Sequence, residues 1–277
     1  MQEDPITLIL GDCAEKLKEI PSESVDLVVT SPPYDNLREY KGYSFDFEKI
    51  ATELSRVIKQ GGVIVWVVGD ATVEGSETGT SFRQALYFKD ALGLNIHDTM
   101  IYLKDQLAFP DSARYYNAFE YMFVLSKGKP STFNPIKDRI NKSEGRKVHG
   151  PERRKDGGLR EQKACAGNIC ERCGVRWNYW LIYNQNRGLE TQHPATFPLS
   201  LASDHIYSWS KEGDTVLDPF MGSGTTGAAS IELGRKFIGI EIAPDYYEIA
   251  KLRIASPNAI KTRWNTSSQF EYDPAFD

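Results

Sequence analysis

The sequence predicts an α/β protein in which helices cover both faces of a mostly parallel β-sheet. Short apolar runs alternate with segments whose apolar residues recur at helical spacing, over residues 6–92 and again over residues 198–254. Two further apolar runs, residues 95–103 and 120–126, are placed to form an antiparallel pair at one edge of the sheet. Residues 127–190 show neither period, which indicates an insertion into this fold.

The elements are expected in the following order. Strands are predicted at residues 6–10, 25–29, 63–68, 215–217 and 236–242, because each is a short apolar run. Helices are predicted at residues 14–20, 47–58, 81–92, 198–208, 225–233 and 244–254. Pro21 ends the first helix, and the pair Gly61 and Gly62 ends the second. Residues 1–130 and 191–277 are therefore expected to form one domain, with residues 131–190 as an inserted region.

The composition is that of a globular protein, with 40% hydrophobic and 26% charged residues. It excludes collagen-like repeats and a disulfide scaffold. The longest apolar run, residues 63–68, is too short to span a bilayer, and the first residues lack the pattern of a secretory signal. We therefore expect a cytoplasmic protein with no membrane partner.

Positive charge is concentrated in one segment of an acidic chain. Residues 127–190 contain 15 Lys and Arg against 7 Asp and Glu, a net charge of +8, which leaves −13 for the rest of a chain whose total is −5. A basic patch on an acidic protein suits a surface that contacts phosphates, although such a run is also compatible with an ordinary solvated face.

Three cysteines of this segment have the spacing C-x4-C-x2-C, namely Cys165, Cys170 and Cys173. A structural zinc ion is normally held by four ligands, and the nearest further ligand, His149, stands at a spacing that fits no common zinc finger. The favoured interpretation is three reduced thiols, and no metal site is predicted.

Two segments almost 190 residues apart carry the candidate chemistry, and each directly follows a predicted strand. The first is the sequence TSPPY, residues 30–34. A serine hydroxyl and a prolyl carbonyl can accept the two hydrogens of an exocyclic amine, and two prolines stiffen the turn that presents them. By itself such a segment is more often a surface turn.

The second segment is DPFMGSGTT, residues 218–226, and it changes that interpretation. Gly222 and Gly224 permit close approach of a ligand to the backbone, and Thr225 begins a helix whose N-terminus suits a carboxylate. Glu241, about 20 residues on, stands where an acid binds ribose hydroxyls. With Gly227 the glycines also fit a dinucleotide fingerprint, but a nicotinamide dehydrogenase would leave TSPPY unexplained.

Four motifs in order resemble those of the amino-methyltransferases that modify DNA: TSPPY, HPATFP at residues 193–198, DPFMGSGTT, and GIEI at residues 239–242. The catalytic motif precedes the cofactor motif, with a basic stretch between them, as in the circularly permuted beta class. The resemblance implies a Rossmann-like, S-adenosylmethionine-dependent methyltransferase fold. It also implies that residues 131–190 occupy the position of the target-recognition region, which contacts double-stranded DNA.

The resemblance implies a role for each matching residue. The catalytic turn would consist of Ser31, Pro32, Pro33 and Tyr34, whose aromatic ring would stack on a base flipped out of the duplex. Cofactor binding would involve Asp12 and Cys13 at the adenine, Glu241 at the ribose, His193, Pro194 and Thr225 at the methionine end, and Asp218, Phe220, Gly222, Ser223 and Gly224 along the pocket. Arg38, Tyr40 and Tyr43 would close over the base or serve as loop packing.

Serine at the start of SPPY is typical of family members that methylate the N4 amine of cytosine, whereas aspartate is typical of adenine-N6 enzymes. The sequence therefore favours a cytosine-N4 DNA methyltransferase of a restriction-modification system or a phage. The alternatives are an adenine-N6 enzyme of the same class, an RNA or protein methyltransferase, and a DNA-binding protein that has lost catalysis. A homodimer and a cognate restriction endonuclease are further expected partners.

Overall fold

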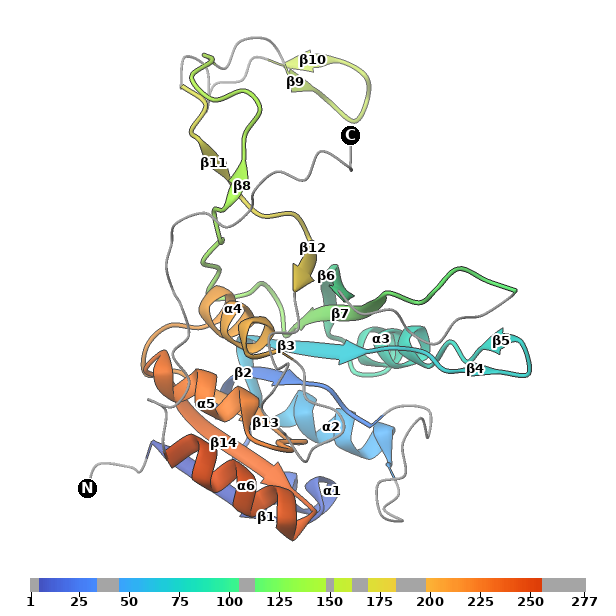
Figure 1. The fold of residues 1–277 in the computed structure, drawn as a ribbon, viewed down its shortest axis with the longest axis vertical. Helices are drawn as coiled ribbons and strands as arrows, with labels where there is room; N and C mark the ends of the chain where they lie inside the picture. The colour runs from blue at the N-terminus through green and yellow to red at the C-terminus, as the bar shows by residue number, and fades with distance from the viewer. Residues whose placement is uncertain are drawn as a thin grey trace. The chain divides into compact units, whose positions relative to one another are not determined.

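The computed structural model describes residues 5–33, 45–104, 113–147, 152–160, 169–182 and 198–255 (Figure 1). The chain divides into two compact units. The first takes in the described residues within Met1–Asn134 and Asn178–Thr262, and the second those within Pro135–Trp177. In the described ranges no helix is long and apolar enough to cross a membrane.

An eight-stranded sheet forms the centre of the first unit, in the order β1-β14-β13-β2-β3-β7-β6-β12. Only β7 runs antiparallel to its neighbours. The strands are β1 (Ile6–Leu10), β2 (Val25–Thr30), β3 (Ile58–Val68), β6 (Asn95–Lys104), β7 (Phe119–Ser126), β12 (Tyr179–Ile182), β13 (Thr215–Asp218) and β14 (Lys236–Glu241). The predicted mostly parallel α/β fold with an antiparallel β6–β7 hairpin is confirmed.

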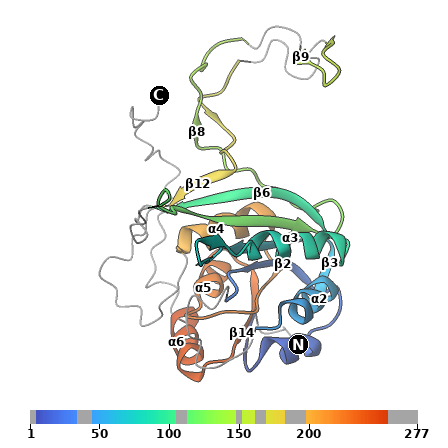
Figure 2. The same cartoon turned by 90° about the vertical axis from the view of Figure 1, so that its right-hand side faces the viewer.

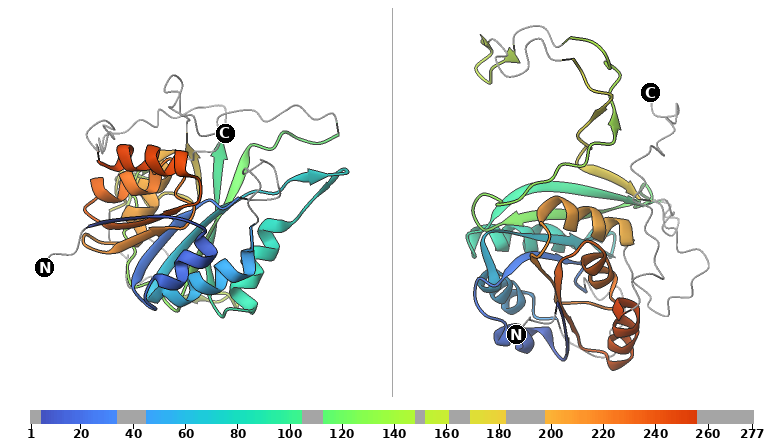
Figure 3. Two further views of the ribbon diagram at one scale, coloured as in Figure 1. Left: turned by 90° about the horizontal axis from the view of Figure 1, so that it is seen from below. Right: turned by 90° about the vertical axis from the view of Figure 1, so that its left-hand side faces the viewer.

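The helices cover the two faces of this sheet (Figures 1 and 3). One face carries α1 (Cys13–Lys16), the 3₁₀ helix η1 (Leu17–Glu19), α2 (Phe47–Val57) and α3 (Thr80–Asp90). The other face carries α4 (Leu199–Trp209), α5 (Thr225–Glu232) and α6 (Pro244–Ala255). A short hairpin of β4 (Thr72–Val73) and β5 (Ser76–Glu77) joins β3 to α3.

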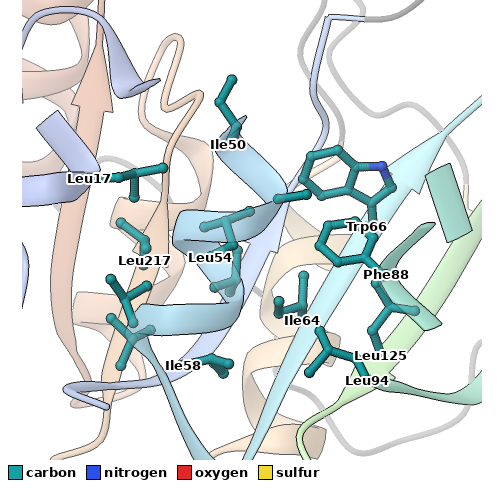
Figure 4. Packing of buried hydrophobic residues seen from close by; sticks show 14 of the residues in the cluster. Leu17, Ile50, Leu54, Ile58, Ile64, Trp66, Phe88, Leu94, Leu125 and Leu217 are labelled. Carbon is teal, nitrogen blue, oxygen red and sulfur yellow. The ribbon is translucent and has the colours of Figure 1, made fainter. Parts of the chain in front are cut away.

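Strand β3 shows how the sequence divides between the two faces. Ile64, Trp66 and Val68 pack into the core under α2 and α3, whereas the alternating Val65 and Val67 pack under α4 and α5. The run is continuously apolar because both faces of a central parallel strand are buried. Figure 4 shows Trp66 in the first of these cores beside Phe88 of α3.

Beyond shifts of one residue at strand ends, two features of the sheet differ from the sequence prediction. Strand β3 begins at Ile58, five residues before the predicted start, so that Gly61 and Gly62 lie inside the strand. The pairing of β3 with β2 shifts register between Val25 and Leu27, and this irregularity accommodates them. Strand β12 pairs in parallel with β6, so the hairpin is one strand in from the edge (Figure 2).

The second unit contains two small antiparallel pairs. One pairs β8 (Arg139–Ile140) with β11 (Cys173–Gly174), and the other pairs β9 (Glu152–Arg153) with β10 (Leu159–Arg160). Arg176 holds the start of this unit through a bidentate ion pair, in which its Nε lies 2.9 and 3.1 Å from the carboxylate oxygens of Asp138. These residues form short strands and turns, in keeping with the lack of periodicity in the sequence.

Candidate active site

Parallel pairing brings the candidate residues to one edge of the sheet. Strands β1, β14, β13 and β2 are consecutive neighbours that all run in the same direction, so their carboxyl ends lie together. Asp12, Glu241, Asp218 and Ser31 stand at or just beyond these four ends. In open α/β sheets this edge is where ligands bind.

Asp218 joins the two motif segments directly. Its carboxylate is 1% exposed, and Oδ1 accepts a hydrogen bond of 2.7 Å from the Thr30 hydroxyl. The other oxygen, Oδ2, accepts from the Thr226 hydroxyl, also at 2.7 Å. Burial raises the pKa of Asp218 to about 6, and the two threonine hydrogen bonds oppose that rise.

Glu241 is oriented by the backbone. Oε2 accepts a hydrogen bond of 2.8 Å from the Gly222 amide, and Oε1 accepts one of 2.8 Å from the Ala243 amide. The side chain is 8% exposed, and burial raises its pKa while these amide hydrogen bonds act in the opposite direction. A carboxylate has lone pairs for further donors, so these contacts fix its direction and leave it able to accept hydroxyls.

The segment from Met221 to Thr225 forms a tight loop that enters α5. The Met221 amide donates to the Ile240 carbonyl at 2.9 Å, and Gly222 and Gly224 have left-handed φ angles of 54° and 81°. A Cβ on Gly224 would lie 3.0 Å from both Cα and Cβ of Ala250 in α6. Glycine is therefore required at Gly224 both by its conformation and by the close approach of α6.

Arg253 of α6 is a residue of this region that the motif reasoning missed. Its Nη1 donates to the hydroxyls of Ser223 at 3.1 Å and Thr225 at 3.0 Å. The side chain is half-buried, and this burial lowers the pKa of the guanidinium. Because Arg253 lies almost 30 residues beyond the loop, no local pattern relates the two; only the tertiary packing of α6 does.

At the end of β1, Asp12 caps the short helix α1. Its Oδ1 accepts a hydrogen bond of 2.9 Å from the Ala14 amide, and the preceding Gly11 amide donates to the Glu241 carbonyl at 2.8 Å. Asp12 is exposed, whereas Cys13 is 8% exposed. Burial is the largest cause that raises the pKa of the Cys13 thiol to about 12, followed by the charge of Asp12.

The turn that the sequence predicts to be catalytic leaves the sheet at the end of β2. Pro32 is buried and Ser31 and Pro33 are half-buried, so the serine retains access to the edge of the sheet. Phe220, from the other motif, packs edge-on against Trp66 with 6.4 Å between ring centroids. The remaining predicted site residues, Tyr34, His193 and Pro194, lie outside the described residues, as do Arg38, Tyr40 and Tyr43.

The basic region contributes a second candidate surface. The Arg139 guanidinium lies 4.4 Å from the ring centroid of Trp177, whose side chain is 54% exposed. Cys170 and Cys173 are half-buried, while Cys165 and His149 lie outside the described residues. Across the ranges that the structure describes, no cluster of three or more His, Cys, Asp or Glu could hold a metal ion.

The geometry fits a bound nucleoside carrying an amino acid. The edge provides a backbone-oriented carboxylate for ribose hydroxyls, a glycine loop and the N-terminus of α5. An acceptor-bearing turn follows the adjacent strand β2.

Comparison with known proteins places the chain in the family that its sequence motifs resemble. The family model described as DNA methylase (N6_N4_Mtase) matches residues 25–252. The orphan methyltransferase M.BamHII of Bacillus amyloliquefaciens is 54% identical over 253 residues, which cover 88% of this chain and 90% of that protein. The chain therefore belongs to the N6/N4 DNA methylase family.

Solved structures agree in fold. TTHA0409 from Thermus thermophilus, complexed with S-adenosyl-L-methionine, has a TM-score of 0.62 and 27% identity, covering 91% of this chain and 93% of that one. The PvuII DNA methyltransferase, named cytosine-N4-specific, has a TM-score of 0.64 and 21% identity, covering 90% of this chain and 88% of that one. This chain is an S-adenosylmethionine-dependent DNA methyltransferase.

Proposed function

We propose that this protein is a site-specific DNA methyltransferase of the permuted beta class that modifies the N4 amine of cytosine. The observation that carries the proposal is the position of the SPP turn. Ser31 directly follows β2, and the preceding Thr30 is hydrogen-bonded to Asp218 of the cofactor segment. The amine acceptor and the glycine loop are therefore parts of one buried framework.

The chain supplies positioning and hydrogen-bond acceptors in this reaction. The Ser31 hydroxyl and the Pro32 carbonyl accept the two amine hydrogens, which draws the nitrogen lone pair out of conjugation with the ring. Two prolines restrict the turn before the substrate arrives. Tyr34 stacks on the base after it has left the duplex. Bound S-adenosylmethionine supplies an electrophilic methyl group, and transfer then depends on proximity and alignment.

The cofactor-binding residues follow from the same edge of the sheet. Glu241 accepts the ribose hydroxyls, since its two oxygens are aimed by the amides of Gly222 and Ala243. Asp12 and Cys13 border the adenine. Ser223 and Thr225, at the N-terminus of α5, hold the methionine end, together with His193 and Pro194. Asp218, Phe220, Gly222 and Gly224 shape the pocket between these groups.

Double-stranded DNA is the proposed partner, and residues 131–190 are proposed to recognise the target. The net charge of +8 over residues 127–190 and the pair formed by half-buried Arg139 and exposed Trp177 support contact with phosphates and bases. The 54% identical relative is named an orphan methyltransferase, which favours a chain that acts without a cognate restriction endonuclease. A homodimer stays a prediction.

The test identifies the product. Purified protein is incubated with unmethylated double-stranded DNA and S-adenosylmethionine, and the digested nucleosides are analysed by mass spectrometry. N4-methylcytosine is the expected product. N6-methyladenine would overturn the base assignment made from Ser31, and no modified base in the presence of bound cofactor would overturn the proposed activity.

A variant pair tests the catalytic turn. The double variant Ser31→Ala, Tyr34→Ala should lose methyl transfer while it retains cofactor binding, because neither side chain is assigned to the cofactor. The matched control is Ser76→Ala, Tyr115→Ala, whose positions are exposed and lie outside the proposed site. Normal methylation by the Ser31, Tyr34 variant would show that the catalytic assignment is wrong.

A further inference from the structure

A chain of three polar side chains connects the catalytic turn with the cofactor loop. Thr30 directly precedes Ser31, and its hydroxyl donates to Asp218 Oδ1 across 188 positions of sequence. Thr226 directly follows Thr225 in the first turn of α5, and its hydroxyl donates to Asp218 Oδ2. Both hydrogen bonds measure 2.7 Å.

This connection is sealed from solvent. Thr30 and Thr226 are 0% exposed and Asp218 is 1% exposed, so water does not compete for the hydroxyl donors. The Phe220 amide also donates to Oδ1 at 3.1 Å, which fixes the rotation of the carboxylate. Hydrogen bonds to a charged acceptor in such an environment are strong and geometrically restrictive.

The residue types suit a connection of this kind. An ionised carboxylate is an acceptor at both oxygens, so it orders two hydroxyl donors at once, whereas an amide in its place would offer one acceptor. Each threonine has a branched Cβ, which limits the rotamers of the hydroxyl. The three side chains therefore define a fixed separation between the end of β2 and the start of α5.

We propose that Thr30, Asp218 and Thr226 are positioning residues, which set the place of the SPP turn relative to the cofactor loop. This proposal deepens the proposed function and rests on it for the identity of the two segments. Transfer of a methyl group is sensitive to misalignment of donor and acceptor, so a shift of the turn lowers the rate without removing any group that touches the cofactor. The connection also makes cofactor occupancy restrain the turn.

The first experiment measures that restraint without requiring activity. Hydrogen exchange of the amides at residues 29–31 is followed with and without S-adenosylhomocysteine, in the wild type, Thr30→Val and Thr30→Ser. We expect the ligand to slow exchange in the wild type and in Thr30→Ser. In Thr30→Val the slowing should be about 10-fold smaller, because loss of one hydrogen bond to a charged group changes an equilibrium by about that factor. Equal slowing in all three proteins would overturn the proposal.

The second experiment separates rate from binding. Thr30→Val should lower kcat for DNA methylation by about 10- to 100-fold, while the dissociation constant of S-adenosylmethionine changes little and Thr30→Ser restores the rate. Thr226→Val serves as the second variant should Thr30→Val fail to fold. The control for a threonine-to-valine change is Thr52→Val, at an exposed position of α2.

The outcomes distinguish the two proposals. An unchanged kcat in both Thr30→Val and Thr226→Val would overturn the positioning role, as would a loss of cofactor affinity as large as the loss of kcat. If the wild type methylates no DNA, the proposed function fails. The exchange experiment still decides whether the three side chains couple the two segments.

Discussion

Replacing Gly224 with alanine should destabilise the protein through two effects that the structure separates. Gly224 has a φ of 81°, and a left-handed conformation costs a non-glycine residue roughly 1–2 kcal/mol. The added Cβ would also lie 3.0 Å from Ala250 Cα and 3.2 Å from Ile254 Cδ1. Because α6 is buried at both residues, this overpacking should cost about 1–3 kcal/mol more.

Gly213 provides the matched control. Its φ is 83°, and no atom lies within 4 Å of a Cβ built on it. Gly213→Ala therefore carries the backbone cost alone, partly offset by the reduced entropy of the unfolded chain, which favours alanine by about 0.4–1 kcal/mol. The two variants should differ by about 1–3 kcal/mol in the free energy of unfolding.

Urea denaturation measures this difference, and calorimetric titration with S-adenosylmethionine measures its consequence. We expect Gly224→Ala to bind the cofactor more weakly, since relief of the contact moves the loop or the N-terminus of α5, and Gly213→Ala to bind normally. Equal stability of the two variants would refute the argument that α6 packs closely against the loop. Normal cofactor affinity in a destabilised Gly224→Ala would refute the expectation that movement of the loop or of α5 weakens cofactor binding.

Three further predictions concern buried or half-buried groups. Arg253→Met should weaken S-adenosylmethionine binding by about 10-fold in calorimetry. Arg253→Lys should weaken it less, because a single nitrogen, Nη1, makes the hydrogen bonds to both Ser223 and Thr225 and a lysine also offers one nitrogen. An affinity of Arg253→Met equal to that of the wild type would contradict this prediction. Burial raises the pKa of Cys13 to about 12, so iodoacetamide at pH 8 should label it only after unfolding, as read by peptide mass spectrometry, and rapid labelling of the native protein would be inconsistent with this burial. Burial also raises the pKa of Asp218 from 3.8 to about 6, so the stabilising contribution of this group falls as pH rises through that window. The urea midpoint of the wild type should therefore fall relative to that of Asp218→Asn between pH 4 and 7. Parallel curves for the two proteins would contradict this expectation.

Local pattern was sufficient for most elements of the fold. Helix α2 matches its predicted range to within one residue, because its apolar residues recur at helical spacing and Asp46 caps its start. Strand β12 could not be found in this way. Tyr179–Ile182 is an apolar run, but four residues are too few to show a strand period, and its partner strand β6 lies about 80 positions earlier in the sequence.

The candidate site was predictable to the same extent. The motifs located Asp218 and Glu241 at strand ends, since an apolar run followed by polar residues is visible in sequence. Their partners were not visible. The hydrogen bond between Thr30 and Asp218 depends on the pairing of β13 with β2, in which Val216 stands opposite Leu27. The hydrogen bonds of Arg253 depend on how α6 packs against the loop.

This difference bears on how the two motifs should be interpreted. A motif written as TSPPY or DPFMGSGTT suggests that each polar residue faces a ligand, yet burial divides them into two groups. Thr30, Asp218 and Thr226 are at most 1% exposed, and both threonine hydroxyls donate hydrogen bonds to Asp218. Ser31, in contrast, is half-buried at the edge of the sheet. Each motif therefore contains buried residues that join the two segments and, beside them, residues that keep access to the edge of the sheet, where we propose that substrate and cofactor bind. Because a sheet can bring two strand ends together from any order along the chain, we expect methyl transfer to require the buried connection between the motifs and not their order in sequence.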